Sequence, residues 1–292
     1  MTPAKPASAM KTALVLAGGG SLGAVQVGML RALLESGVEP DMVVGSSVGA
    51  MNGAYYAGTP SAEGVDRLVQ IWLGLRRRDV FPIAWRTLIG LPLKRDFLVG
   101  SEGLRRLVET HLPFRDLQDA KIPLHIVATN ILSGEAVVLS EGSAAAAILA
   151  STAIPAAFAP VHHAGSYLAD GAITSCTPVR VAVEKGANRL IVLQTGYACA
   201  RQSPPSGAIA SALHALTLLI SRQVTHELES LNESIDYHVV PPLCPLVGSP
   251  YDFSHTGELI ERASASTDAW ISAGGLKQRT IPHEMLPHAH GK

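Results

Sequence analysis

Two glycine-rich turns near the start of the chain contain the residue types that a chemical reaction would need. Residues 18–23 (GGGSLG) have the GxGxxG spacing, and residues 45–49 (GSSVG) have the GxSxG spacing. GxGxxG after a strand is typical of a dinucleotide-binding loop, because its glycines let the backbone approach a pyrophosphate. GxSxG between a strand and a helix is typical of a nucleophilic serine on a strained turn. Each pattern alone leaves its function open.

The dinucleotide interpretation lacks the acidic residue that such a loop needs. In that fingerprint, an Asp or Glu about 20 positions further on ends the second strand and binds the ribose hydroxyls. Asp41 lies near this spacing, but it precedes the second expected strand, and residues 45–47 (GSS) stand where the acid should be. A dinucleotide-binding protein is therefore the alternative hypothesis.

Ser47 is placed like the nucleophile of a hydrolase. Residues 42–44 are a short apolar run typical of a buried strand, and residues 47–57 read as a helix of small residues. Ser47 would then lie at a helix N-terminus, where the positive end of the helix dipole favours a developing alkoxide. In ordinary α/β-hydrolases, however, this turn follows a late strand. The non-catalytic alternative is a tight turn with a capping serine.

The two turns lie within an alternation of strands and helices. Strands are expected at residues 12–17, 42–44, 124–130, 135–139, 190–194 and 236–240. Helices are expected at residues 21–36, 47–57, 178–186, 207–231 and 256–273. This alternation predicts an α/β fold with a mostly parallel central sheet sandwiched by helices.

Taken together, the two turns resemble the patatin-like phospholipases, which have a glycine-rich loop after the first strand and GxSxG after the second. That family also has a DG signature followed by a small residue, and residues 170–172 (DGA) resemble it. Residues 150–160 (ASTAIPAAFAP) are similar to the family's approach to this signature. The resemblance extends from about residue 12 to residue 193. It implies a three-layer, patatin-like architecture and a serine hydrolase that acts on lipid esters.

The resemblance also implies a role for each motif residue. Ser47 would attack the ester carbonyl and form an acyl-enzyme, and Asp170 would accept its proton. The oxyanion would be bound by the backbone N–H groups of Gly18, Gly19 and Gly20. The turns would be supported by Gly23, Gly45, Gly49, Gly171 and Ala172. An aspartate with its ordinary pKa of about 4 is a weak base for a serine hydroxyl, so the surroundings would have to assist it. No cofactor or metal is expected.

Two positions depart from the family pattern, and histidines leave a triad open. Leu22 stands where many members have Arg or Lys, and Cys176 stands where many have Asn, which would alter the support of the Asp170 loop. The histidines that could complete a triad are His162, His163, His214, His226, His238 and His255. The early position of GxSxG in the chain favours a dyad of Ser47 and Asp170.

Residues 72–97 combine cations with large apolar side chains. Six basic residues oppose two acidic ones in this segment. They are interleaved with Trp72, Phe81, Trp85, Leu88, Ile89, Leu91 and Phe97. The composition fits a lid that contacts anionic lipid headgroups, and it equally fits a core-facing loop with a solvated basic rim.

The composition limits the class of protein. The chain has 292 residues, of which 47% are hydrophobic and 16% are charged, and a formal net charge of -1. This length suits one large domain or two small ones, and the net charge gives no electrostatic reason to bind nucleic acid. Because no repeat or low-complexity linker forces a boundary, we expect one domain over residues 12–275 with flexible tails at 1–11 and 276–292. The three cysteines form no CxxC pair, so neither a zinc cage nor a disulfide framework is indicated. In the C-terminal tail, His283, His288 and His290 would be a metal site only if that tail were ordered.

The expected location follows from what the sequence lacks. Residues 1–11 contain no apolar segment of a secretory signal, and no run of about 18 uncharged apolar residues occurs. We therefore expect a cytoplasmic protein in peripheral contact with an anionic membrane. The leading hypothesis is a phospholipase, lysophospholipase or carboxylesterase. The alternatives are a dinucleotide-binding protein and a catalytically idle interaction module of the same fold.

Overall fold

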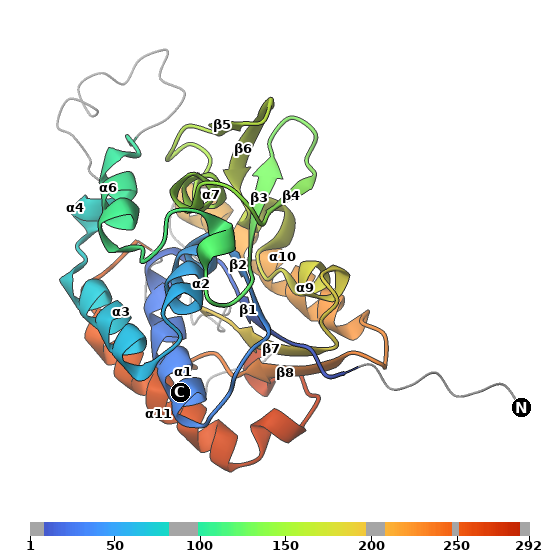
Figure 1. The fold of residues 1–292 in the computed structure, drawn as a ribbon. Coiled ribbons are helices and arrows are strands. Elements are labelled where there is room, and N and C mark those ends of the chain that lie inside the picture. Colours follow the sequence, from blue (N-terminus) through green and yellow to red (C-terminus); the bar gives the residue numbers. More distant parts are fainter. Residues whose placement is uncertain (1–8, 82–98, 197–207, 247–250, 287–292) are drawn as a thin grey trace, which may run out of the picture.

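A computed structural model describes residues 9–81, 99–196, 208–246 and 251–286 of the chain. Within these residues, one eight-stranded sheet lies between two layers of helices (Figure 1). The predicted α/β fold with a mostly parallel central sheet sandwiched by helices is confirmed. The carboxyl ends of its parallel strands point towards one edge, and both glycine turns lie there.

The sheet has a parallel centre and an antiparallel side. The parallel strands are β1 (Thr12–Leu16), β2 (Met42–Ser46), β3 (Leu124–Asn130), β7 (Arg189–Leu193) and β8 (Asp236–Val240). The antiparallel strands are β4 (Ala136–Leu139), β5 (Val161–His163) and β6 (Ser166–Asp170). Hydrogen-bonded neighbours follow the order β5-β6-β3-β2-β1-β7-β8, and β4 pairs with β3.

One edge of β3 is shared by two strands that meet end to end. Val127 of β3 pairs with Ser46 of β2 and with β4, whereas the next residue, Ala128, pairs with Asp170 of β6 and with β4. A strand residue has one neighbour on each side, so β4 occupies one edge of β3 while β2 and β6 share the other. β2 runs parallel to β3 and β6 runs antiparallel to it, so the carboxyl ends of β2 and β6 face each other.

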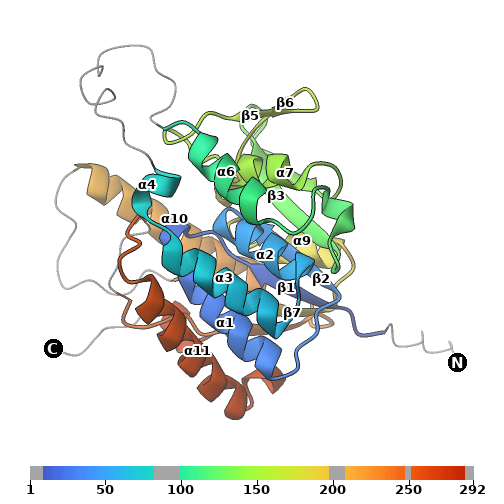
Figure 2. The ribbon, with the colours of Figure 1, turned by 60° about the vertical axis from the view of Figure 1, so that its left-hand side comes forward.

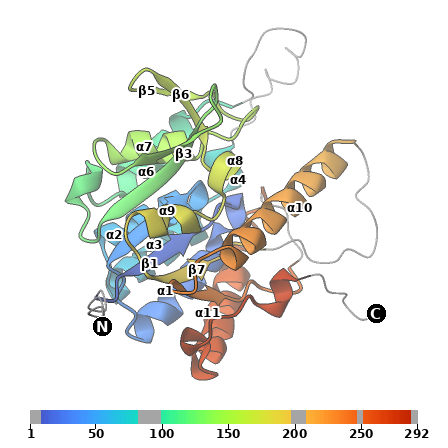
Figure 3. The same cartoon turned by 90° about the vertical axis from the view of Figure 1, so that its right-hand side faces the viewer.

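Helices cover both faces of this sheet. One face is covered by α1 (Gly23–Glu35), α2 (Val48–Gly58), α3 (Ala62–Gly74) and α11 (Thr256–Ser272), as Figure 2 shows. The opposite face is covered by α9 (Val179–Glu184) and α10 (Ala208–Glu229), as Figure 3 shows. The remaining described helices are α4 (Arg77–Val80), α6 (Glu102–His111), α7 (Ala144–Ser151) and α8 (Ala172–Ser175). Short 3-10 turns occur at Gly20–Leu22, Leu117–Asp119, Gly275–Lys277 and His283–Met285.

The alternation of side chains along the strands produces two cores. In β1, Leu14 and Leu16 face the cluster beneath α1 and α2, whereas Ala13 and Val15 face the cluster beneath α9 and α10. Strands buried on both faces read as continuous apolar runs, which is why β1 could be predicted from sequence. The buried Met285 belongs to the second cluster, so part of the segment predicted as a flexible C-terminal tail packs on the domain.

Most strands follow from the sequence, but the hairpin of β5 and β6 does not. Strands β5 and β6 were not predicted, although β6 ends at Asp170. Their short, polar sequences contain His162, His163 and Ser166 and lack a clear alternation of apolar residues. None of the helices in the described segments is long and apolar enough to cross a bilayer.

Candidate active site

Ser47 lies on a strained turn between β2 and α2. Its φ of 54° and ψ of -126° are unusual for a residue with a side chain, and such strain persists only where the surroundings hold it. The Ser47 N–H donates to Ser151 Oγ at 2.8 Å, and Ser151 Oγ donates to the Val127 carbonyl at 2.6 Å. Ser151 therefore ties the turn to β3. The Ser47 hydroxyl makes no capping bond to α2, so the capping alternative is wrong.

Glycines at both ends of this turn allow close packing. A Cβ atom at Gly49 would overlap the Leu16 carbonyl at the end of β1, and one at Gly45 would overlap the backbone of Gly49. Both glycines are therefore required for α2 to begin directly against the carboxyl ends of β1 and β2. A Cβ at Gly171 would likewise overlap the Val127 carbonyl, which explains the glycine after Asp170.

Asp170 meets Ser47 because β2 and β6 end against each other. Ser47 Oγ donates to Asp170 Oδ2 at 2.7 Å, and the Ala172 N–H donates to Asp170 Oδ1 at 2.8 Å. Both oxygens of the carboxylate are thus engaged, one by the proposed nucleophile and one by the backbone of its own turn. The structure brings together the two side chains to which the sequence assigned the chemistry, although they are 123 positions apart.

Burial changes the acidity of Asp170. Its side chain is 3% exposed, and desolvation raises its pKa from 3.8 to about 6, although the hydrogen bonds from Ser47 and Ala172 favour the charged form. At neutral pH the carboxylate is ionised and is a stronger base than an ordinary aspartate. The weakness expected of an unperturbed aspartate is thereby reduced.

The first glycine turn follows β1 and faces the second. The Gly18 N–H donates to the Cys176 carbonyl at 2.9 Å, and the Gly18 carbonyl accepts from Thr195 Oγ1 at 2.6 Å. The predicted use of the Gly18 N–H as an oxyanion donor is therefore wrong, because this group is already bonded within the protein. Gly18 instead provides space, since a Cβ atom there would lie 3.2 Å from Ser47 Cβ.

Gly19 and Gly20 are the remaining predicted donors. Within the described residues, no acceptor is bonded to the N–H of either glycine. Gly20 has a φ of 60°, which favours glycine, and it lines the same pocket as Ser47. A Cβ atom at Gly19 would overlap the Thr195 hydroxyl. The N–H groups of Gly19 and Gly20 therefore differ from that of Gly18, which is bonded within the protein.

Cys176 and Leu22, which depart from the family pattern, are both partly buried. The Cys176 backbone carbonyl supports the glycine turn, and burial raises the pKa of its thiol to about 12, so the thiol stays protonated. Leu22 packs against the larger hydrophobic core. The loop is therefore held by a backbone hydrogen bond at Cys176 and by apolar contacts at Leu22.

No described histidine is hydrogen-bonded to Ser47 or Asp170 in the structure. His238 is bonded to Asp236 and to the carbonyl of Gln278, while the ring of His162 lies against that of Tyr167. The side chain of His214 lies outside the described residues. Among the residues that the structure does describe, no group of His, Cys, Asp and Glu could hold a metal ion.

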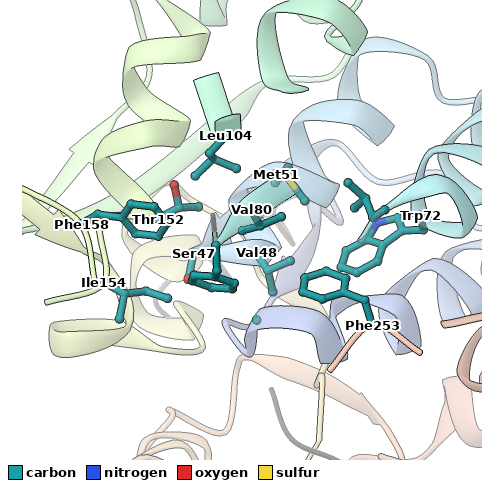
Figure 4. Close-up of a pocket in the computed structure, with 13 residues that line it drawn as sticks. Ser47, Val48, Met51, Trp72, Val80, Leu104, Thr152, Ile154, Phe158 and Phe253 are labelled. Atoms are coloured by element: carbon teal, nitrogen blue, oxygen red, sulfur yellow. The ribbon is translucent and has the colours of Figure 1, made fainter. Parts of the chain in front are cut away.

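An apolar pocket opens at Ser47 (Figure 4). Its lining consists of Gly20, Ser47, Val48, Met51, Trp72, Leu75, Val80, Phe81, Leu104, Thr152, Ile154, Phe158 and Phe253. Ser47 lies between Ile154 and Phe158 on one side and Phe253 and Trp72 on the other. Thr152 is the other polar side chain in this lining, and its hydroxyl is bonded to the Ile148 carbonyl. The pocket therefore suits a hydrocarbon group beside the serine.

Two aromatic side chains of the segment at 72–97, for which the sequence leaves both a lipid-facing lid and a core-facing loop open, line this pocket. Trp72 is 1% exposed, and Phe81 packs against Phe158 and Tyr251 with ring centroids 5.6 and 5.4 Å away. For these two residues the core-facing interpretation holds, because the core buries them. The other large apolar residues of the segment, Trp85, Leu88, Ile89, Leu91 and Phe97, lie outside the described residues. A lid in that part of the chain stays a prediction.

The residues that hold the site were harder to identify than those that form it. Ser151 lies in the run at 150–160 that resembled the family, but no local pattern gave it a role. Thr195 follows β7 and reaches the glycine turn from a position 177 residues away. Only the pairing of β1 with β7 brings them together.

The α/β fold thus places a buried serine, bonded to a carboxylate, next to a glycine turn and an apolar pocket. The sequence profile described as patatin-like phospholipase matches residues 14–183. The chain belongs to the patatin-like phospholipase family, as the motifs predicted. Membership supports lipid hydrolysis as its general function.

Individual relatives match more than half of the chain. Patatin-like phospholipase domain-containing protein 7 of Mus musculus is 28% identical over 186 residues, which cover 63% of this chain and 13% of the mouse protein. An uncharacterized NTE family protein of Mycobacterium tuberculosis is 30% identical over 178 residues, covering 59% of this chain and 45% of that protein. The chain thus spans less than half the length of these relatives. Among solved structures, VipD from Legionella pneumophila aligns with a TM-score of 0.46 at 16% identity, covering 90% of this chain and 67% of VipD.

Proposed function

We propose that this protein is a serine hydrolase of lipid esters that uses a dyad of Ser47 and Asp170. The observation that carries the proposal is the 2.7 Å hydrogen bond from Ser47 Oγ to the buried carboxylate of Asp170. A hydroxyl that donates to a base can lose its proton as it attacks a carbonyl carbon. The adjoining pocket of apolar side chains supports a substrate with a hydrocarbon chain.

The reaction begins when Ser47 Oγ attacks the ester carbonyl and its proton passes to Asp170 Oδ2. The negative charge that develops on the carbonyl oxygen is stabilised by the N–H groups of Gly19 and Gly20. Collapse of this intermediate expels the alcohol, which takes the proton from Asp170, and leaves the acyl group on Ser47. A water molecule then attacks the acyl-enzyme, and Asp170 accepts its proton. Collapse of this second intermediate releases the carboxylic acid, and the proton returns from Asp170 to Ser47 Oγ.

The structure offers less support to the two alternatives. A dinucleotide loop needs free backbone N–H groups for the pyrophosphate, whereas that of Gly18 is bonded to Cys176. An idle interaction module has no need of the strained Ser47 or of a carboxylate whose burial raises its pKa. These features are costly, and they cluster where the chemistry would occur.

The test compares two neighbouring serines of one turn. Ser47→Ala should abolish hydrolysis of p-nitrophenyl acyl esters, because the nucleophile is removed while the fold is kept. Ser46→Ala is the matched control: Ser46 is equally buried, and its hydroxyl has no hydrogen-bond partner in the described residues. Activity above a few per cent in Ser47→Ala, or equal losses in both variants, would contradict the assignment.

We further propose that the protein approaches its substrate at an anionic membrane surface. Arg76, Arg77 and Arg78 are exposed at the start of α4, next to the pocket wall. Clustered cations near an apolar opening favour contact with anionic headgroups. Binding to vesicles of phosphatidylglycerol that is absent with phosphatidylcholine would support this step, and equal binding to both would contradict it.

A further inference from the structure

A chain of buried polar side chains connects the pocket wall to the first glycine turn, and the reaction described above does not use it. Trp72 Nε1, in the pocket wall, donates to Asn52 Oδ1 at 2.9 Å. Asn52 Nδ2 donates to Gln26 Oε1 at 3.0 Å and to the Gly23 carbonyl at 3.0 Å. The chain therefore runs from α3 through α2 to α1.

Gln26 continues this chain to the sheet. Its Nε2 donates to the Ala17 carbonyl at 2.8 Å and to the Leu193 carbonyl at 3.1 Å. Ala17 immediately precedes the glycine turn, and Leu193 is the last residue of β7. One side-chain amide thus joins the carboxyl ends of β1 and β7.

Both amides are saturated with hydrogen bonds. Gln26 and Asn52 are 0% exposed, and the oxygen and nitrogen of each amide group have partners inside the protein. A buried amide without partners is costly, so the surrounding donors and acceptors fix the orientation of each side chain. Apolar side chains of similar size would fill the same space, so a polar chain here requires an explanation.

The ends of this chain flank the residues that would bind the oxyanion. The Ala17 carbonyl lies before Gly18 and the Gly23 carbonyl lies after Leu22, so the turn over residues 18–22 is anchored at both ends. Gly19 and Gly20, with their N–H groups, lie between these anchors. Oxyanion donors act through fixed geometry, and small displacements of reacting groups are costly in rate.

We propose that Gln26 and Asn52 are positioning residues of the oxyanion turn and couple it to Trp72 in the pocket wall. The inference rests on the proposed function, because it assigns the turn an oxyanion. Trp72 is itself stacked on Phe253, with ring centroids 6.2 Å apart. Movement of the wall is therefore transmitted to the turn through hydrogen bonds.

The experiment replaces each amide by an apolar side chain of similar size. In Gln26→Met and Asn52→Leu, we expect kcat for a soluble p-nitrophenyl ester to fall about ten-fold or more, with KM changed less than about three-fold. The matched control is Thr267→Val, which removes a buried hydrogen bond of 2.7 Å from Thr267 Oγ1 to the Ala263 carbonyl. This bond lies within α11, which contributes no hydrogen bond to the turn in the described residues. It should lower the Tm and leave kcat unchanged.

A third variant tests the same coupling if the two amide variants do not fold. Trp72→Phe removes the indole N–H but keeps an aromatic ring against Phe253, and kcat should fall several-fold. Unchanged kcat in the folded variants, or a rise in KM at constant kcat, would overturn this inference alone. Absence of Ser47-dependent turnover in the parent would overturn the proposed function as well.

Discussion

The reactive pair and the pocket wall are assembled in opposite ways. Ser47 and Asp170 lie at the ends of two strands that share one edge of β3, so backbone hydrogen bonds set their separation. The pocket wall comes from the helices α2, α3, α4 and α6 and from the turns and loops between elements, including the segment around Phe253. The sheet therefore sets the distance between Ser47 and Asp170, whereas packing between helices sets the shape of the pocket.

The largest expected effect is a loss of turnover when the pair at the strand ends is changed. Asp170→Asn should lower kcat by orders of magnitude, because an amide cannot accept the Ser47 proton. His163→Gln, at the nearest histidine in the sequence, should stay within a few-fold of the parent, since His163 makes no hydrogen bond to either residue in the structure. If His163→Gln were as damaging as Asp170→Asn in folded protein, a triad would operate and the dyad would be wrong.

The pH dependence should report the same carboxylate. Burial raises the pKa of Asp170 to about 6, so kcat/KM should reach a plateau above that pH and fall about ten-fold per unit below it, as the base becomes protonated. A pH series with a neutral soluble ester measures the profile. A midpoint near 4 would indicate a solvated carboxylate, contrary to the buried pair in the structure.

The role of the pocket in substrate binding is tested by replacing an aromatic side chain of its wall. Phe81→Ser should raise KM for a soluble acyl ester about ten-fold, because it removes ring contacts with Phe158 and Tyr251. Trp85→Ser, in the segment predicted as a lid, should weaken binding to anionic vesicles and leave turnover of the soluble ester intact. If Phe81→Ser changed only vesicle binding, its side chain would face lipid and the pocket assignment would be wrong.

The smallest expected effect concerns stability, and it has the opposite sign to the effect on rate. Because the pKa of Asp170 rises from 3.8 to about 6 on folding, its ionised form destabilises the native state above pH 6, and this cost disappears as the pH falls towards 4. Asp170→Asn should therefore raise the free energy of unfolding at pH 8 by up to about 3 kcal/mol. Thermal unfolding at pH 8 and pH 4.5 tests this, and an equal gain at both values would contradict it.

The sequence predicted the parts of the site that local rules determine. Strand-to-helix turns with bare flanks require glycine, so Ser47 and the turn at 18–23 could be recognised, and continuous apolar runs marked β1 and β7. The assignment of Gly18 failed because its N–H is taken by Cys176, a partner 158 positions away. No local sequence pattern predicts this hydrogen bond.

The supporting residues could not be predicted for a related reason. Gln26 and Asn52 look like polar residues of two ordinary helices, and only the packing of α1 and α2 on the sheet shows that neither touches solvent. Trp72 and Phe81 lie among exposed arginines in the sequence, so their burial was equally hidden. Burial that results from contacts between distant segments leaves no short sequence motif by which it could be predicted.

The most direct test of the central claim is covalent labelling with a fluorophosphonate, followed by mapping of the modified peptide. The dyad predicts one adduct, on Ser47, which forms in the parent and in Phe81→Ser, is much slower in Asp170→Asn, and is absent in Ser47→Ala. An adduct on another serine, or none in folded parent protein, would contradict the assignment of Ser47 as the nucleophile.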